Sequence, residues 1–169
     1  MNRTELEACM EEVMAECKAL KIPISGKIDP QIYINRRAKS RFAACKREAG
    51  KECYKIEVCE SLLGTDRMTV KSILAHELLH TCCGCYNHGD RWKFYADMMN
   101  RNYGYDIKTV TTYEALGLKA PDKKKTIRYM VVCQRCGKKI YRQKKSRLIT
   151  NTSDYRCSCG GRLKAYKAE

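Results

Sequence analysis

HELLHTCCGCYNHGDRW, residues 76–92, holds all three histidines of the chain, three of its twelve cysteines and one glutamate. His76 and His80 are four positions apart within a segment of helical periodicity. On an α-helix, this spacing places two side chains about 40° apart around the axis and about 6 Å apart along it. Both imidazoles can therefore reach one tetrahedral metal ion, and the fold must be organised around this helix.

Glu77 directly follows the first histidine, where its carboxylate can face a water on the metal without being a ligand. This is the HExxH arrangement of zinc hydrolases, in which zinc lowers the pKa of its water toward about 7 and the carboxylate accepts the proton. The alternative is a chance match on an amphipathic helix. Leu78 and Leu79 would bury that helix, however, and two histidines on a buried stripe need partners. We therefore predict a catalytic zinc with His76 and His80 as ligands and Glu77 as general base.

The third ligand has more than one candidate. His88 follows His80 by eight positions, across a turn that contains Gly84, and would complete a three-histidine site with one position open to water. Cysteine ligands would instead give a closed, structural site; the candidates are Cys82, Cys83 and Cys85. The first two lie within one turn of His80, where binding would distort the helix. We predict that His88 is the ligand, keep Cys85 as the alternative, and expect the cysteines to pack in a tight turn.

Composition and charge narrow the class of protein. No run of about 18 apolar residues is present, and the acidic N-terminus lacks the apolar region of a signal peptide. We therefore expect a cytoplasmic, intracellular protein without membrane contact, whose cysteines are reduced, some on metal and others buried as small hydrophobes. Residues 122–169 carry 15 Lys/Arg against 3 Asp/Glu, which is +12 of the net charge of +15. This one-sided excess favours a polyanionic partner over a merely solvated surface and would also suit association with the nucleoid.

Periodicity and turn residues predict an α+β fold of the minimal zincin type, with helices packed on a small antiparallel sheet and a small β module behind it. Asp66 should cap the helix that carries the histidines. The domain limits that we expect are 1–118 for the zincin domain, 119–126 for the linker and 127–169 for the basic module. The other predicted elements are helices at 3–20, 67–80 and 90–103, strands at 31–37, 40–47, 52–61, 127–133, 138–143, 155–159 and 162–167, and a hairpin loop at 49–51.

Four cysteines near the C-terminus have the spacing of a structural zinc site: Cys133, Cys136, Cys157 and Cys159. The second pair is one residue shorter than the common C-x2-C, and glycines follow both pairs at 137, 160 and 161, where they let backbone amides turn toward sulfur. Four thiolates leave no open position, so this zinc would be structural, and a module of this size would need it to fold. Four unrelated buried cysteines are the alternative.

Basic side chains are frequent between these cysteine pairs and would bind DNA or RNA phosphates: Lys138, Lys139, Arg142, Lys144, Lys145 and Arg147. Tyr141 and Tyr155 lie among them and could stack on exposed bases. Tyrosines of a small β module more often fill its core, however, so we expect core positions for both.

HELLH followed by HGDRW resembles the SprT-like metalloprotease family, which pairs HExxH with a downstream HGxxW or HGxxF. The family includes Spartan, which digests proteins crosslinked to DNA. CQRC (133–136) and CSCGGRL (157–163) resemble the zinc ribbon of many bacterial members. The resemblance implies zinc ligation by His76, His80 and His88, with Glu77 as general base. The short connection from His80 to His88 and the cysteines at 82–85 depart from the family pattern.

We therefore predict a zinc-dependent endopeptidase whose substrates are proteins associated with nucleic acid. A zinc-dependent nuclease using the same histidines is one alternative, and a non-enzymatic nucleic-acid-binding protein is another. Glu77 favours peptide chemistry over the nuclease, because small three-histidine ribonucleases lack a glutamate after the first histidine. The group that stabilises the transition state stays open among four tyrosines: Tyr86, Tyr95, Tyr103 and Tyr105.

Overall fold

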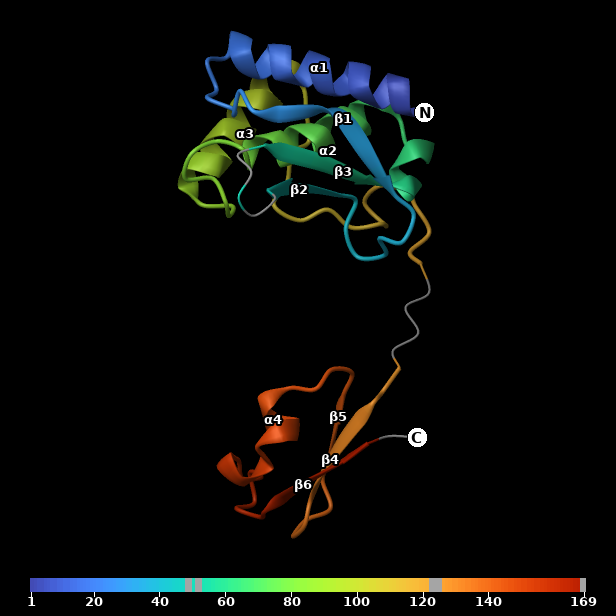
Figure 1. Ribbon diagram of the computed structural model, residues 1–169, viewed down its shortest axis with the longest axis vertical. Coiled ribbons are helices and arrows are strands. Elements are labelled where there is room, and N and C mark those ends of the chain that lie inside the picture. The colour runs from blue at the N-terminus through green and yellow to red at the C-terminus, as the bar shows by residue number, and fades with distance from the viewer. Residues whose placement is uncertain (48–49, 51–52, 122–125, 168–169) are drawn as a thin grey trace. The chain divides into compact units, whose positions relative to one another are not determined.

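The chain folds into two compact units, Met1–Pro121 and Asp122–Glu169, in the computed structural model (Figure 1). The structure describes residues 1–47, 50, 53–121 and 126–167. The linker predicted at 119–126 includes residues 122–125, and the hairpin loop predicted at 49–51 includes residues 49 and 51; these six positions lie outside the described residues. The α+β class predicted from the sequence is confirmed. Within the described part of the chain, no helix has the length and apolar character needed to cross a membrane.

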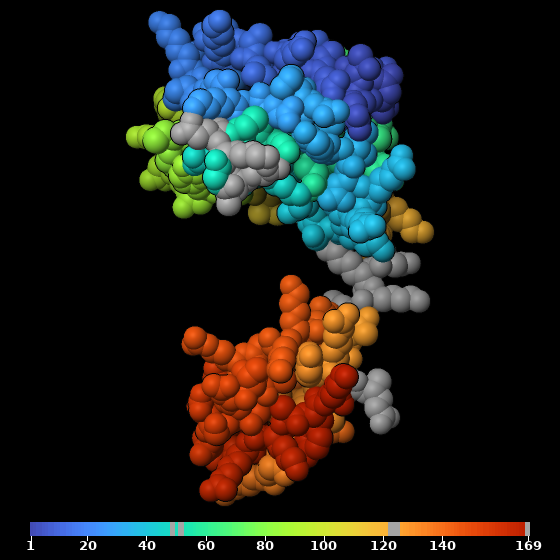
Figure 2. Space-filling view, in the orientation of Figure 1, coloured from blue at the N-terminus to red at the C-terminus, as the bar shows by residue number. Residues whose placement is uncertain are grey.

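The N-terminal unit packs its helices against one three-stranded sheet with strand order β1-β3-β2. Its elements are α1 (Arg3–Ala19), β1 (Ile28–Asn35), β2 (Ala43–Arg47), β3 (Tyr54–Cys59), the 3-10 helix η1 (Glu60–Gly64), α2 (Arg67–Leu79) and α3 (Asp90–Tyr103). Helix α1 and strand β1 lie side by side at the surface of this unit (Figures 1 and 2). Apolar side chains from α1, the sheet, α2 and α3 form a single core, to which Leu6, Ile56 and Leu74 contribute.

The prediction of an antiparallel sheet is wrong for one of its two strand pairs. Strand β2 pairs antiparallel with β3, but β1 pairs parallel with β3 on its other side. The segment between β1 and β2 crosses to the far edge of β3, so that β1 and β3 run in the same direction. Pro30 lies within β1, where the register shifts between Ile28 and Ile32. An edge strand tolerates proline because the missing N–H costs no ladder hydrogen bond there.

Helix α2 begins at Arg67, as the sequence predicts, and ends at Leu79, one residue before the predicted end. The side chain of Asp66 caps it by accepting a hydrogen bond from the backbone N–H of Thr69 (2.9 Å). After His80 the chain turns through Gly84, whose φ of +76° is a left-handed conformation that favours glycine. Helix α3 then runs to Tyr103 and ends at Gly104, which has a φ of +68°. The two helices thus bracket residues 80–89, which carry the third histidine.

The C-terminal unit is built on a three-stranded antiparallel sheet of order β5-β4-β6. Its elements are β4 (Tyr129–Cys133), β5 (Lys139–Arg142), α4 (Arg147–Thr150), the 3-10 helix η2 (Thr152–Asp154) and β6 (Leu163–Lys167). The strand predicted at 155–159 is wrong: this segment makes only the isolated bridge Arg156–Arg162 and then turns at the cysteines. Among the described residues of this unit, the buried apolar core comprises Val131, Cys133, Cys157 and Leu163. So small a core needs a crosslink or a metal to be stable.

Candidate metal centre

The three histidines converge at the end of α2. The Nε2 atom of His76 lies 3.3 Å from Nε2 of His80 and 3.0 Å from Nε2 of His88. Two nitrogens bound to one tetrahedral ion at about 2.0–2.1 Å would be roughly 3.3 Å apart. The helix supplies His76 and His80 at a separation of four residues, and the loop before α3 brings His88 to them. This group can therefore hold one metal ion.

Backbone carbonyls fix the orientation of two of these rings. Nδ1 of His76 donates to the carbonyl of Lys108 (2.9 Å), and Nδ1 of His80 donates to that of Cys85 (2.7 Å). A carbonyl oxygen only accepts, so each Nδ1 carries the proton and each Nε2 presents a lone pair. Burial lowers the pKa of His76 to about 4, and burial also lowers the pKa of His88. Burial therefore favours the neutral imidazole at His76 and His88, which is the form that binds metal.

Trp92 forms the floor beneath all three imidazoles. Its ring centroid lies 4.8 Å from that of His76, 5.7 Å from that of His80 and 4.5 Å from that of His88. The indole is 1% exposed. It therefore excludes water from one side of the group and limits the rotation of the rings, a positioning role that the sequence analysis did not assign.

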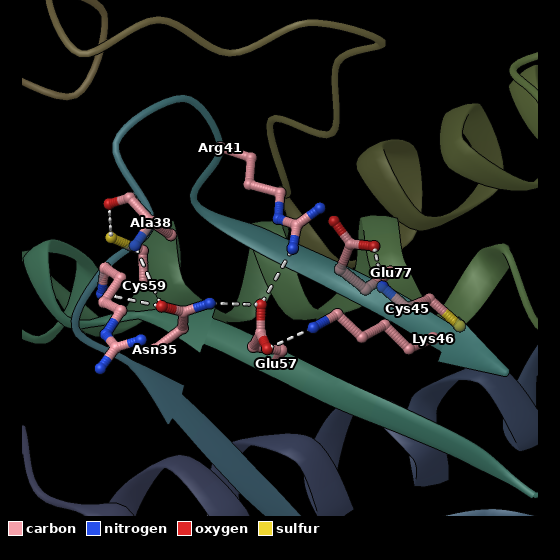
Figure 3. Close-up of polar contacts among 9 residues, drawn as sticks. Asn35, Ala38, Arg41, Cys45, Lys46, Glu57, Cys59 and Glu77 are labelled. Atoms are coloured by element: carbon pink, nitrogen blue, oxygen red, sulfur yellow. Dashed lines mark hydrogen bonds and ion pairs between the residues drawn. The ribbon is translucent and has the colours of Figure 1, made fainter. Parts of the chain in front are cut away.

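Glu77 is held beside the histidines by the sheet. Its side chain is buried, and Oε2 accepts a hydrogen bond from the backbone N–H of Cys45 in β2 (2.7 Å; Figure 3). Burial raises the pKa of Glu77 to about 7, while the Cys45 N–H and the charge of Arg41 act in the opposite direction. A dication bound by the histidines would also lower the pKa of Glu77, because positive charge favours the carboxylate form. The carboxylate is thus fixed next to the metal-binding group without being a member of it.

A groove follows β2 across Glu77 and consists of two adjoining depressions. The first, of about 200 Å³, lies on the His76 side and is walled by Phe42, Ile73 and residues 109–111. The second, of about 330 Å³, lies on the His80 side and includes Tyr54 and Tyr86. Ala43 and Glu77 line both depressions. The metal-binding group therefore opens into a groove that extends in both directions.

The structure narrows the choice among the four tyrosines. The hydroxyls of Tyr103 and Tyr105 both donate to Glu16 of α1, to its carbonyl and its carboxylate respectively. Tyr95 packs against Phe94 on α3. Tyr86 is 70% exposed and lines the groove together with His80. Tyr86 is therefore the tyrosine that a ligand in the groove would meet.

Two of the three cysteines next to the histidines are packed in the core, as expected, and the expectation is wrong for Cys83. Cys82 and Cys85 are buried, whereas Cys83 is exposed, and none of the three joins the metal-binding group within the described residues. Cys85, the alternative ligand considered from the sequence, acts instead through its backbone carbonyl on His80. The sequence shows no signal for this contact, because a carbonyl is common to every residue.

The four cysteines of the C-terminal unit also converge. The Sγ atoms of Cys133 and Cys159 are 3.5 Å apart, and those of Cys136 and Cys157 are 3.6 Å apart. Backbone N–H groups point at sulfur: the N–H of Cys136 lowers the pKa of Cys133, and the N–H of Cys159 lowers the pKa of Cys157 to about 6. Sulfurs bound at about 2.3 Å to one tetrahedral ion lie only slightly further apart. This group fits a zinc ribbon.

Gly161 is required at the cysteine cluster. A Cβ at this position would lie 2.6 Å from Sγ of Cys133 and 2.7 Å from Cβ of Arg135. Gly160, with a φ of +79°, turns the chain just before it. These two glycines let the shortened C-x-C pair close on the other two sulfurs.

The predicted nucleic-acid contacts lie at the surface of this unit. All six basic side chains are exposed: Lys138, Lys139, Arg142, Lys144, Lys145 and Arg147. The expectation that the tyrosines fill the core is wrong, since Tyr141 is 51% and Tyr155 is 38% exposed. The core face of the sheet is already filled by Val131 and its neighbours.

The fold and these two groups define an α+β protein with a three-histidine metal site and a separate four-cysteine site. The model of the SprT-like family matches residues 7–114, more than half of the chain. The chain therefore belongs to the SprT-like family. This match covers most of the N-terminal unit, including all three histidines and Glu77. No curated protein matches the chain at a significant level.

The assignment of His88 as a ligand predicts that His88→Ala lowers metal content far more than Cys85→Ser. Alanine removes one of three converging lone pairs, whereas serine keeps the backbone carbonyl that orients His80. Metal analysis of purified protein should show a loss of about half of the bound metal in the first variant and nearly none in the second. A loss confined to Cys85→Ser would transfer the ligand role to the cysteine.

The close approach at Gly161 predicts that Gly161→Ala destabilises the C-terminal unit. The new methyl group would overlap Cys133 and force the cluster open, at a cost of about 1–3 kcal/mol. Thermal unfolding and the rate of metal loss to a chelator should both report this. Ser158→Ala, at an exposed position between the same cysteines, is the matched control and should behave as wild type.

Proposed function

We propose that this protein is a zinc-dependent endopeptidase whose substrates are proteins associated with nucleic acid. The observation that carries the proposal is the convergence of three histidines, two of them oriented by backbone carbonyls, next to a buried glutamate that the sheet holds in place. Membership of the SprT-like family supports a metallopeptidase.

Zinc is the metal that best fits the two groups. Three imidazole ligands with one open coordination position are typical of catalytic zinc, and four thiolates are typical of structural zinc. His76, His80 and His88 would hold the first ion, and the four cysteines of the C-terminal unit would hold the second. When bound at the histidines, zinc supplies the Lewis acidity that lets water attack a carbonyl near neutral pH.

Glu77 is the group that moves the proton in this mechanism. Its carboxylate would accept a proton from the attacking water and deliver it to the nitrogen of the leaving amine. The hydrogen bond from the Cys45 N–H occupies Oε2 and leaves Oε1 for this task. Because burial keeps competing water away from the carboxylate, the proton is retained until the peptide nitrogen takes it up.

The groove supports an extended peptide as substrate. Strand β2 is an edge of the sheet and borders the groove on both sides of Glu77. An extended chain can lie along such an edge, where backbone groups give affinity and side chains enter the flanking depressions. A groove open in both directions favours cleavage within a chain over removal of terminal residues.

This mechanism predicts that Glu77→Gln abolishes hydrolysis without loss of metal. The amide keeps the volume of the carboxylate but cannot accept the proton, so the rate should fall by about 10² to 10⁴ or more. Cleavage of casein, metal analysis and thermal unfolding of the same preparations would test it. Turnover at the wild-type rate would remove Glu77 from the chemistry.

The C-terminal unit is proposed to bind single-stranded nucleic acid through one face of its sheet. Met130 of β4 pairs with Tyr141 of β5 and with Tyr166 of β6, so these three side chains form one row on the face opposite Val131. Both tyrosines are well exposed. Exposed rings in a row can stack on successive bases, and the interaction does not depend on sequence.

Cations flank this aromatic row. Lys139 and Lys164 both pair with Val132 in the adjacent row of the same face, and Nζ of Lys164 lies 5.6 Å from the centre of the Tyr166 ring. They would bind the phosphates between stacked bases. Nucleic acid held there would raise the local concentration of proteins bound to the same strand, which is why we propose such proteins as substrates.

This arrangement predicts two distinguishable effects on binding to single-stranded DNA. Tyr141→Ala and Tyr166→Ala should each weaken binding by about 1–3 kcal/mol with little change in salt dependence. Lys139→Ala combined with Lys164→Ala should reduce the slope of log K against log salt by about 1.4, the value for two phosphate contacts. Fluorescence anisotropy across a salt titration measures both effects.

The matched control for the lysine pair is Lys18→Ala combined with Lys21→Ala, two lysines of the N-terminal unit. These substitutions should leave the salt slope unchanged. DNA should also stimulate cleavage of histone by wild-type protein, and the tyrosine variants should lose the stimulation. Equal effects of both lysine pairs on the slope would contradict the assignment of this face.

A further inference from the structure

The charges that line the groove are unequal in sign. Arg41 borders the depression on the His76 side, and Arg47 borders the one on the His80 side. Glu77 is the one acidic side chain among the described residues that line either depression. A dication at the histidines would more than offset that carboxylate. A substrate therefore meets positive charge at the centre of the groove and at both of its ends.

A hydrogen bond to Glu57 of strand β3 anchors the side chain of Arg41. Its Nη2 donates to Oε1 of Glu57 (3.1 Å), and Glu57 also accepts hydrogen bonds from Asn35 and Lys46 (Figure 3). The side chain of Glu57 is only 16% exposed, whereas that of Arg41 is 51% exposed. A guanidinium has five N–H donors, so anchoring through Nη2 leaves others directed at the groove. Arg41 lines the same depression as His76 and Glu77, which places it beside the centre of the groove.

The depression beside Arg41 has the chemistry of a site for an acidic side chain. Phe42, Ile73 and Val110 give it apolar walls that suit methylene groups, and Thr109 and Thr111 add hydroxyl groups. Its volume of about 200 Å³ admits one side chain of moderate size. A glutamate or aspartate entering it could reach the guanidinium, which pairs with carboxylates in a fork geometry.

Arg47 occupies the corresponding place at the other end of the groove. Its guanidinium carbon lies 5.8 Å from the centre of the Tyr54 ring, and both side chains line the second depression. Arg41 and Arg47 precede and end strand β2, so an extended peptide along this strand would pass both. Lys46 is on the same strand but pairs with Glu57 on the opposite face of the sheet.

We infer that the groove selects peptide segments with acidic side chains on both sides of the scissile bond, with Arg41 and Arg47 as the specificity-determining residues. The inference rests on the proposed function, since it assumes that a peptide occupies the groove. A carboxylate could also come from the end of a chain. The groove continues through a second depression on the other side of Glu77. A peptide that crosses both depressions would present side chains, and not a chain end, to the arginines. We therefore favour a side-chain carboxylate.

Binding tests the inference without catalysis. Zinc-loaded protein with Glu77→Gln should bind a short fluorescent peptide, amidated at its C-terminus and carrying glutamates on both sides of a neutral centre, about tenfold more tightly than the glutamine version. Adding Arg41→Ala or Arg47→Ala should each remove discrimination at one end only, and at opposite ends. Lys18→Ala in α1 is the control, because this lysine lines neither depression and does not contact Glu57, and it should leave discrimination intact.

Binding of peptides with a glutamate on only one side of the neutral centre identifies which arginine recognises which side of the substrate. Arg41→Glu should reverse the preference at its end in favour of lysine, which a loss of folding would not do, and thermal unfolding checks the fold of each variant. Equal effects of Arg41→Ala and Lys18→Ala, or tighter binding of lysine than of glutamate peptides to the wild-type groove, would overturn the inference. Binding that requires a free C-terminal carboxylate would also overturn it, in favour of a terminal-residue site.

Cleavage separates this inference from the proposed function. Zinc-loaded wild-type protein should cleave the glutamate peptide with a kcat/KM about tenfold above that of the glutamine peptide, mainly through KM. If the acidic peptide binds selectively but neither it nor casein is cleaved, the proposed endopeptidase activity fails while the selectivity stands. If casein is cleaved without any preference for acid, the selectivity fails and the activity stands.

Discussion

Two hydrogen bonds from imidazole to backbone carbonyl determine what the rest of this structure can do. Lys108 and Cys85 accept the Nδ1 protons of His76 and His80, and this leaves both Nε2 lone pairs directed at one point, where His88 adds a third. Lone pairs that converge in this way repel one another unless a cation lies between them. The fold stabilises that arrangement through the Trp92 floor and through a helix whose apolar stripe is buried, so the site is pre-organised at a cost that core packing offsets.

The sheet matters chiefly for what its edge offers to this centre. Because β2 is paired on one side only, the backbone N–H of Cys45 is free of the ladder and donates to Glu77. The same edge borders the groove, with Arg41 just before the strand and Arg47 at its end, so one strand fixes Glu77, the proposed general base, and borders the proposed substrate path. A central strand could do none of these, since its backbone groups would be paired on both sides. The parallel pairing of β1 with β3 is what leaves β2 at this edge.

The features predicted correctly from the sequence are local, and those missed are not. The helical spacing of His76 and His80, the cap at Asp66 and the two cysteine pairs each depend on residues a few positions apart, where geometry follows from periodicity and spacing. The contacts of Glu77 with Cys45 and of His76 with Lys108 each span 32 residues and use backbone atoms, which no residue type reveals. The direction of β1 depends on which edge of β3 it joins, and alternation of apolar residues reports the faces of a strand but not its neighbours. The exposed tyrosines of the C-terminal unit were missed because its core is so small that four other side chains fill it.

With a dication bound, the two candidate metal sites would carry net charges of opposite sign, and nearby groups partly neutralise each of them. A dication on neutral imidazoles is an excess of positive charge, which the buried carboxylate of Glu77 partly neutralises. A dication on four thiolates is an excess of negative charge, which backbone N–H groups at Cys133 and Cys157 and the cations of the C-terminal unit partly neutralise. Part of the positive charge in residues 122–169 therefore offsets the charge of the cysteine cluster, and only the remainder would be available for the proposed binding of phosphates. This is why the proposal for nucleic-acid binding rests on the aromatic row of Tyr141 and Tyr166 rather than on net charge alone, since stacking depends little on the charge of the cysteine cluster.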